Sequence, residues 1–341
     1  MRNKSQSTIA IIVVLVVAIA AGAYLLLRSP APKPMPAPVP APTEPQTPTP
    51  AQPEPIAGVP QFNKSKYTSE PTIKVWRADK GVIESMKLET YVEGVIAQEM
   101  QPDWPLEALR AQAVASRTLT MSAIEAGTIR RLHNADVSTS KEELQAFAPQ
   151  KVNDTVREAV RSTRGQILLY AGGLVNSIYS SHNGQIAATK EESFPKEIEH
   201  ATPYFQPVTD NSNQYAPQNI SSWSVKIPGA EVARAVGYSG KPGDITILQK
   251  GPSGRILYIG AGNKKVYGSD FRKAVGYDRL KSTLITEMTY DGSSFTFKGL
   301  GWGNGVGMSQ WGAYAYAKNG AKAEEILKHY YVGADITKLW Q

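Results

Sequence analysis

The sequence contains no cysteine and only four histidines in its 341 residues. The absence of cysteine excludes disulfide bonds and metal sites built from thiolates. The histidines are scattered along the chain, so we expect no bound metal, and nothing in the sequence calls for a cofactor. A chain of this length can bury a sufficient core without disulfides, and their absence therefore does not assign a compartment.

A concentrated block of positive charge is also missing. The net charge of +7 is spread along the chain, and there is no lysine–arginine run, zinc-finger spacing or RNA-binding aromatic motif. These absences argue against nucleic acid as a partner.

A long apolar segment lies near the N-terminus. Arg2 and Lys4 precede nineteen uncharged, mostly apolar residues from Ile9 to Leu27. This length spans the hydrocarbon core of a membrane, and the positive residues before it place the N-terminus in the cytoplasm. We therefore predict a signal-anchor in residues 1–28, whose span at 9–27 crosses the cytoplasmic membrane once and leaves the C-terminal domain outside. A cleavable signal peptide is the alternative, because small residues between Ala18 and Ala23 offer a cleavage site.

Residues 29–66 read as a linker. Thirteen of the 32 residues from Ser29 to Pro60 are proline, many alternating with alanine. Such a segment adopts an extended polyproline conformation, which at ~3.1 Å per residue reaches roughly 100 Å. An exported, mildly basic protein on such a tether suits an anionic cell-wall polymer.

Residues 67–341 have the patterning of a folded domain. Helical periodicity is present in residues 88–99, 106–125, 152–163, 271–275, 308–318 and 323–331. Strand-like segments are residues 72–76, 82–86, 166–170, 174–181, 223–227, 245–249, 255–259 and 295–297, with a hairpin expected across 171–173. Residues 130–149 read as a loop. Strands and helices are interspersed without strict alternation, which predicts an α+β fold.

The helix predicted at 88–99 places a carboxylic acid on its apolar face. Val92, Val95, Ile96 and Glu99 share one face, and prolines just beyond Glu99 end the helix. Burial and the negative end of the helix dipole both favour the protonated acid. A protonated carboxyl is what a general acid requires. A solvated residue on a frayed last turn, or a structural partner for a buried arginine, is the alternative interpretation.

The next helix aims an arginine inward. Arg117 shares an apolar face with Leu109, Ala113 and Met121, and a buried guanidinium nearly always has a carboxylate or carbonyl partner. Glu99 and Glu107 are both near in sequence, and the pattern does not choose between them.

A glycine-rich stretch covers residues 299–312, between a predicted strand and a predicted helix. Its spacing matches neither a dinucleotide fingerprint nor a phosphate-binding loop. Glycines let a backbone approach a ligand closely, and Trp302 and Trp311 suit stacking on sugar rings. A tight structural turn with core tryptophans is the alternative.

Several motifs, in order along the chain, resemble those of the SpoIID/LytB family of bacterial cell-wall proteins. They are Tyr-Val-Glu-Gly-Val-Ile-Ala-Gln-Glu-Met (91–100), Trp-Pro-Leu-Glu-Ala-Leu-Arg-Ala-Gln-Ala-Val-Ala-Ser-Arg-Thr (104–118), Ala-Val-Arg-Ser-Thr-Arg-Gly-Gln-Ile-Leu (159–168), Tyr-Ser-Ser-His-Asn-Gly (179–184), Gly-Trp-Gly-Asn-Gly-Val-Gly-Met-Ser-Gln-Trp-Gly-Ala (301–313) and Ile-Leu-Lys-His-Tyr-Tyr-Val-Gly (326–333). The resemblance implies a two-lobed α+β domain with a central cleft that acts on peptidoglycan.

In this family the glutamate of the Glu-Met pair is taken as the catalytic acid of a lytic transglycosylase, which implies Glu99 here. Such an enzyme cuts between N-acetylmuramic acid and N-acetylglucosamine without water, and one carboxyl serves as acid and then as base. The family's glycine stretch usually carries histidine where this chain has Asn304. Some members bind zinc through cysteine and histidine near the region of Ser138 and His182, and this chain lacks the cysteines.

The further residues expected to orient Glu99 or bind sugar are Arg117, His182, Trp302, Asn304, Ser309 and Gln310. The expected partners are the glycan strands, the membrane through residues 9–27, and a cell-wall amidase. A second function stays open, because the family name also covers wall-binding activators of an amidase, in which Glu99 would be structural.

Overall fold

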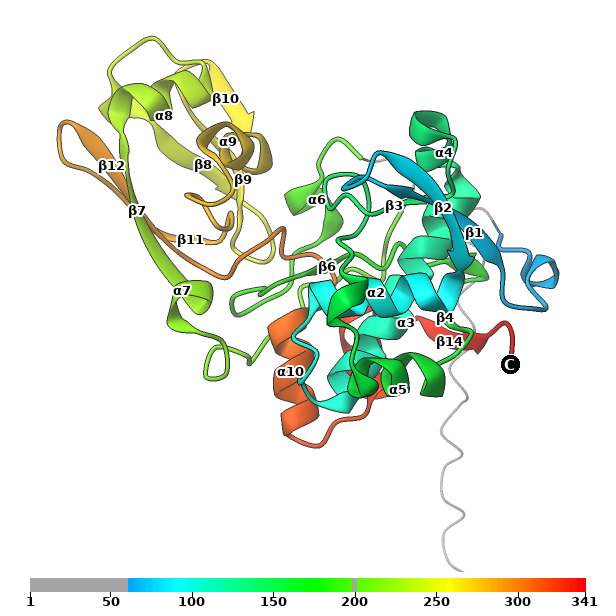
Figure 1. Cartoon of the computed structure of the whole chain (residues 1–341). Helices are drawn as coiled ribbons and strands as arrows, with labels where there is room; N and C mark the ends of the chain where they lie inside the picture. Colours follow the sequence, from blue (N-terminus) through cyan, green and yellow to red (C-terminus); the bar gives the residue numbers. More distant parts are fainter. Residues whose placement is uncertain (1–60, 198–200) are drawn as a thin grey trace, which may run out of the picture. The chain divides into compact units, whose positions relative to one another are not determined.

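The computed structural model describes residues 61–197 and 201–341, which form a mixed α+β fold with several small sheets (Figure 1). The α+β prediction is confirmed. The predicted anchor and all of the linker except residues 61–66 lie outside the described residues. Within the described ranges, no helix combines the length and apolar character that a membrane crossing needs.

The first elements build the support for Glu99. Strand β1 (Thr72–Arg77) pairs antiparallel with β2 (Val82–Lys87), and helix α2 (Leu88–Glu99) starts directly after β2. The turn at residues 100–105 leads into the long helix α3 (Leu106–Ala126). The elements that follow are α4 (Thr128–His133), β3 (Val137–Ser138), α5 (Asp154–Ser162), β4 (Gln166–Tyr170), β5 (Gly173–Leu174), β6 (Tyr179–Ser180) and α6 (Lys190–Ser193).

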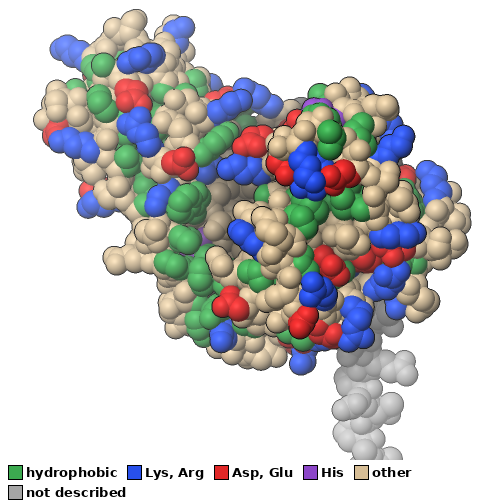
Figure 2. Space-filling model, in the orientation of Figure 1, with side chains coloured by type: hydrophobic (Ala, Val, Ile, Leu, Met, Phe, Trp, Pro, Cys, Tyr) green, Lys and Arg blue, Asp and Glu red, His purple; other side chains and the backbone are tan. Residues whose placement is uncertain are grey.

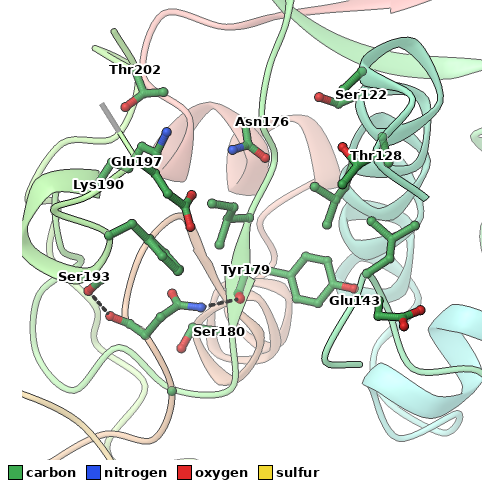
Figure 3. Close-up of a pocket in the computed structure, with 18 of the residues that line it drawn as sticks. Ser122, Thr128, Glu143, Asn176, Tyr179, Ser180, Lys190, Ser193, Glu197 and Thr202 are labelled. Atoms are coloured by element: carbon green, nitrogen blue, oxygen red, sulfur yellow. Dashed lines mark hydrogen bonds between the residues drawn. The ribbon is translucent and has the colours of Figure 1, made fainter. Parts of the chain in front are cut away.

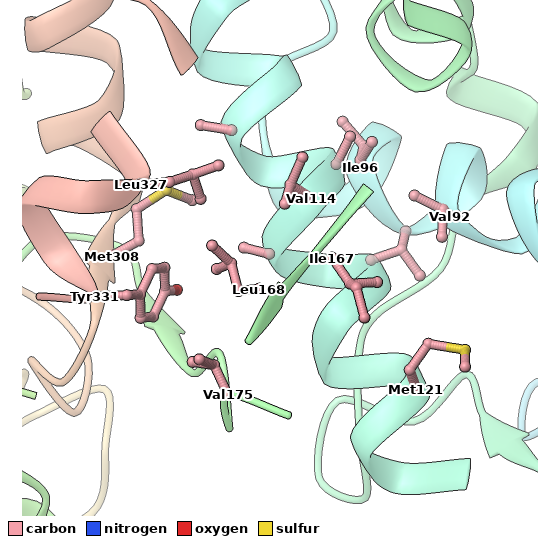
Figure 4. Packing of buried hydrophobic residues seen from close by; sticks show 14 of the residues in the cluster. Val92, Ile96, Val114, Met121, Ile167, Leu168, Val175, Met308, Leu327 and Tyr331 are labelled. Atoms are coloured by element: carbon pink, nitrogen blue, oxygen red, sulfur yellow. The ribbon is translucent and has the colours of Figure 1, made fainter. Parts of the chain in front are cut away.

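Helices α2 and α3 run through a first buried core. The predicted apolar face of α2 is confirmed, since Val92, Val95 and Ile96 are shielded completely from solvent. They belong to one cluster with Val114 of α3 and Leu168 of β4 (Figure 4). The end of α2 is therefore fixed by packing as well as by its own hydrogen bonds.

A second, separate cluster is built by the next segment. Phe271, Phe295 and Phe297 are fully or almost fully buried there. Its strands form two three-stranded sheets, in the orders β11-β12-β7 and β10-β9-β8. The elements are α7 (Gln218–Ser221), β7 (Ser222–Pro228), α8 (Gly229–Val236), β8 (Thr246–Lys250), β9 (Ile256–Ala261), β10 (Lys264–Tyr267), α9 (Gly268–Val275), β11 (Ile285–Tyr290) and β12 (Ser294–Leu300).

Three short 3₁₀ helices lie at Lys64–Lys66, Pro149–Lys151 and Pro242–Asp244.

The last segment returns to the first core. Strand β13 (Met308–Ser309) pairs in parallel with β6, and β14 (Asp335–Lys338) pairs antiparallel with β4. Helices α10 (Gln310–Lys318) and α11 (Ala323–Tyr330) lie between these strands in sequence. The glycine-rich stretch thus joins β12 of the second core to β13 and α10 at the first.

Two expectations about the middle of the chain are confirmed only in part. The hairpin predicted from residues 166–181 is confined to β4 and the short β5, because β6 leaves it to pair with β13. The loop predicted at 130–149 contains α4 and β3, and β3 adds to β1 in parallel. Strands β3 and β6 both pair with strands distant in sequence, which local patterns do not encode.

Candidate active site

Glu99 is the last residue of α2, and both oxygens of its carboxylate accept hydrogen bonds. Oε1 accepts from the backbone N–H of Ala146 at 3.0 Å, and Oε2 accepts from Nε2 of Gln310 at 3.3 Å. Gln310 is the first residue of α10. Three segments far apart in sequence therefore meet at this carboxylate.

The pKa of Glu99 is raised above its ordinary value, and burial of the carboxylate is the largest cause. The hydrogen bonds from Ala146 and Gln310 oppose this effect, as do the nearby hydroxyl of Tyr179 and the positive charge of Lys141. Burial outweighs them because moving an anion out of water costs more than these neutral donors return. The site thus stabilises the protonated acid, as the helix pattern predicted.

Glu99 lines a cavity of about 1470 Å³. The phenol of Tyr179 lies beside Glu99 in the same cavity and donates a hydrogen bond to Oε1 of Gln145 at 3.0 Å. The Tyr179 ring points toward the side of the cavity where Glu143 lies (Figure 3). Gln145 is itself held by Thr120 of α3, to which its Nε2 donates at 2.9 Å.

The segment 139–148 forms one wall of this cavity. Lys141, Glu142, Glu143 and Leu144 all line it. Oε1 of Glu143 lies 2.8 Å from Nε2 of His133, and Oε2 accepts a hydrogen bond from the hydroxyl of Ser138 at 2.6 Å. The same segment supplies the Ala146 N–H and Gln145, so its fixed conformation sets the environment of Glu99.

The structure brings Asn304 and Gln310 to Glu99's surroundings, as expected. Asn304 lines the cavity, and its Nδ2 makes a long contact of 3.5 Å with the carbonyl of Tyr179. Its Oδ1 accepts from the N–H of Val306 at 2.8 Å, which holds the glycine-rich stretch in its turn. Gln310 contacts the carboxylate directly.

Arg117 is placed elsewhere, and neither glutamate considered from the sequence is its partner. Its Nη2 lies 2.6 Å from Oε2 of Glu89, the second residue of α2, and its Nη1 donates to the carbonyl of Gln166 at 3.0 Å. Its side chain has no exposed surface. Arg117 therefore ties α2, α3 and β4 together, and this position does not support the expected contact with sugar or with Glu99.

His182 and Ser309 are also buried as parts of the scaffold. Nδ1 of His182 accepts from the N–H of Gly184, and Nε2 lies 2.9 Å from the hydroxyl of Ser212, which donates to Asp210. Burial lowers the pKa of His182, and the charge of Arg255 lowers it further against the opposing effect of Asp210. Ser309 caps α10 by accepting from the N–H of Gly312 at 3.0 Å. Neither residue is among those that line the cavity around Glu99.

Trp302 lies within the glycine-rich stretch, close to its start. It exchanges backbone hydrogen bonds with His182, at 3.0 and 2.9 Å. The Nζ of Lys281 lies 4.4 Å from the centre of its ring, a cation–π contact. The ring does not line the cavity around Glu99.

The charge pattern agrees with the sequence. Acidic and basic side chains are interspersed on the visible face rather than gathered by sign (Figure 2). In the part of the chain that the structure describes, no three His, Asp or Glu side chains gather as a metal site would require.

Three contributors to the Glu99 environment were not found from the sequence. Tyr179 is the first residue of the motif at residues 179–184, and that motif could have indicated its importance. Gln145 and Ala146 lie in a segment with no periodicity. Ala146 acts through its backbone N–H, so its residue type gives no indication of this role.

A family model described as Stage II sporulation protein, SpoIID, matches residues 77–170, which include α2, α3 and Glu99. An uncharacterized protein from Brachyspira hyodysenteriae is 32% identical over 256 residues, covering 75% of this chain and 68% of that protein. The chain belongs to the SpoIID family. Members of this family are cell-wall-related proteins of the cell envelope.

Two further relatives of this chain have names that state a function. A stage II sporulation protein D from Bacillus amyloliquefaciens is 28% identical over 290 residues, covering 79% of this chain and 82% of that protein. A Bacillus subtilis protein named amidase enhancer is 28% identical over 297 residues, covering 72% of this chain but only 40% of that protein.

Proposed function

We propose that this chain is a peptidoglycan lytic transglycosylase that cleaves glycan strands between N-acetylmuramic acid and N-acetylglucosamine. The observation that carries the proposal is the Glu99 carboxyl, which lines a large cavity with a raised pKa and has both oxygens held by fixed donors. Membership of the SpoIID family supports the choice of a cell-wall polymer as substrate.

The chemistry needs one carboxyl group. Protonated Glu99 gives its proton to the glycosidic oxygen, and the bond from that oxygen to the anomeric carbon of the muramyl sugar breaks. The sugar's own hydroxyl then bonds to the anomeric carbon and returns its proton to Glu99, which leaves an anhydro-muramyl end. Water is not consumed, so the paired carboxylates of ordinary glycosidases are not required.

The test is Glu99→Gln, assayed by mass spectrometry of the fragments released from purified peptidoglycan. Glutamine keeps the shape but cannot transfer a proton, and general acid catalysis typically contributes ~10²–10⁴-fold. We expect anhydro-muramyl products from the wild type and a loss of that size in the folded variant. Glu93→Gln is the matched control, because Glu93 lies on the same helix and burial also raises its pKa.

The alternative function is that of a non-catalytic activator of a cell-wall amidase, favoured by the relative named amidase enhancer. The same assay separates the two. An activator would yield no anhydro-muramyl ends, would raise product release by an added amidase, and would do so equally well with Glu99→Gln.

We also propose that residues 9–27 anchor the protein in the cytoplasmic membrane, with residues 67–341 outside and residues 29–66 as the tether. The support is the charge asymmetry around the apolar run. A reporter enzyme fused after Gln341 should be active outside the membrane, and activity confined to the cytoplasm would contradict the proposed topology.

A further inference from the structure

Four aromatic rings gather at the start of α10. Trp311 and Tyr314 lie on that helix, Trp104 lies in the turn between α2 and α3, and Tyr215 lies in the segment before α7. The centre of the Trp104 ring is 4.6 Å from that of Trp311 and 5.1 Å from that of Tyr314, and the Tyr215 and Tyr314 centres are 5.8 Å apart. All four side chains are partly exposed. We call these four residues the aromatic platform.

The platform is joined to the environment of Glu99 through the start of α10 and the turn after α2, although none of its four residues is among those that line the cavity around Glu99. Trp311 directly follows Gln310, whose side chain donates to the Glu99 carboxylate. Trp104 follows Glu99 by five residues, across the short turn that ends α2. Because Trp311 and Tyr314 are three positions apart on α10, their rings lie on the same side of the helix. Ala313, on the other side of the helix, is buried.

Packing explains only part of this arrangement. Trp104 packs against the first core, and its 56° tilt to Trp311 is common for packed aromatic pairs. All four side chains nevertheless retain solvent exposure. The hydroxyl of Tyr215 donates to Oδ1 of Asn319 at 3.1 Å, which fixes that ring at the edge of the platform.

The chemistry of the platform suits a sugar polymer. An aromatic ring offers a broad apolar face with a negative quadrupole, which matches the C–H-bearing face of a pyranose ring. Lys318 lies 5.5 Å from the centre of the Tyr314 ring and puts a positive charge beside the platform. A carboxylate of a wall polymer would be attracted there.

We propose that the aromatic platform is a subsite that binds the glycan strand beside the bond to be cut, with sugar rings stacked on Trp311 and Tyr314. The inference rests on the proposed function for the identity of the strand. It assigns to this surface the binding energy that holds a neutral sugar chain in register with Glu99.

The experiment is isothermal titration calorimetry with a hexamer of β-1,4-linked N-acetylglucosamine, carried out in the Glu99→Gln background so that cleavage does not consume the ligand. Trp311→Leu and Tyr314→Leu should each raise Kd about fivefold or more, the scale of truncating an aromatic anchor in an interface. Trp311→Phe keeps a ring and should retain most of the affinity.

The matched control is Tyr258→Leu. Tyr258 is also a partly exposed tyrosine in an aromatic pair, with its ring centre 4.9 Å from that of Tyr267, but it lies on β9 in the second core. The Kd of the Tyr258→Leu variant for the hexamer should equal that of the Glu99→Gln parent. Thermal unfolding of each variant shows whether it is folded, and if Trp311→Leu fails to fold, Tyr314→Leu decides the outcome.

Equal affinity of the parent and both platform variants would overturn the proposal, as would a parent that does not bind the hexamer. The proposed function fails separately, through the absence of anhydro-muramyl products from the wild type. Loss of binding in the platform variants without any cleavage by the wild type would support the subsite and contradict the proposed enzymatic activity.

Discussion

At the scale of single residues, Glu99 is held between two opposing influences. Burial favours its protonated form, while its two hydrogen-bond donors, the nearby Tyr179 hydroxyl and Lys141 favour its charged form. In the proposed role of general acid, Glu99 must both hold a proton and release it, so the anion left after transfer also needs partners. The donors from Ala146 and Gln310 supply them without a positive charge that would keep the acid ionised.

The raised pKa predicts how stability depends on pH. The pKa of Glu99 is higher in the folded than in the unfolded chain, so protonated Glu99 stabilises the fold below its unfolded pKa, and this contribution is lost as the pH rises through the folded pKa. Glu99→Gln does not titrate. Its unfolding free energy, relative to that of the wild type, should therefore increase as the pH rises above about 4.5.

Urea unfolding of both proteins at several pH values measures this difference. If Glu99 is the proposed acid, cleavage by the wild type should decrease at the upper end of the pH interval in which the difference in stability develops, because folded Glu99 loses its proton there. A difference in unfolding free energy that stays constant from acid to neutral pH would contradict the raised pKa.

Residue-scale prediction from the sequence succeeded where the contacts are local. The helical period and the prolines placed Glu99 at the end of α2 because those signals lie within twelve residues. The partner of Arg117 was beyond such reasoning. Glu89 lies 28 residues earlier on another helix, and its carboxylate also accepts from the N–H of Gly165 and from Nε1 of Trp340. A site assembled from four segments is a property of the tertiary fold.

At the scale of elements, the glycine-rich stretch needs its glycines for backbone shape. Gly307 has a φ of +68°, and a Cβ placed there would lie 2.0 Å from the carbonyl oxygen of Ile178. Such an approach is tolerated only without a side chain. It permits β13 to pair with β6, which brings Gln310 to Glu99.

Gly307→Ala should therefore be strongly destabilising. Gly81→Ala is a matched control, because Gly81 has the same φ of +68° but no heavy atom within 4 Å of the added Cβ. In the control, the free energy of unfolding should decrease only by the cost of placing alanine in the left-handed conformation, roughly 1–2 kcal/mol. Gly307→Ala should lose clearly more, measured by chemical denaturation. Equal losses would show that the contact with Ile178 relaxes freely.

Element types were predictable from the sequence to a greater extent than element pairings. The strands at β1, β2, β7 and β12 and the helices α2, α3 and α5 lie where their periodicity indicated. The parallel pairing of β6 with β13 joins residues more than a hundred positions apart. Two-residue strands carry too little pattern to reveal such a partner.

At the scale of the whole described fold, the two buried cores are joined through a buried arginine. Arg255 immediately precedes β9 of the second core and has no exposed surface. It donates to the carbonyls of Asn183 and Ile186, each at 2.8 Å, and to the hydroxyl of Ser253 at 2.9 Å. Burial lowers its pKa to about 10, so it stays charged at neutral pH.

Arg255→Met should uncouple the two cores. The methionine fills part of the space but leaves the carbonyls of Asn183, which is buried, and Ile186, which is half-buried, without this donor. Each loss costs up to about 1–3 kcal/mol. We expect the wild type to unfold in one transition and the variant to unfold in two, with the second core opening first. Trp223 belongs to the second core and Trp340 to the first, so single-tryptophan versions report on each separately.

The control is Arg279→Met, which removes an arginine of the same segment that is paired with Glu231 in a partly exposed ion pair. Exposed pairs contribute about 0–1 kcal/mol, so this variant should unfold like the wild type. Coincident transitions in Arg255→Met would show that the remaining contacts couple the cores. Separate transitions would assign the coupling to Arg255, and cleavage should then decrease although Glu99 is unchanged, because the glycine-rich stretch that carries Gln310 runs between the cores.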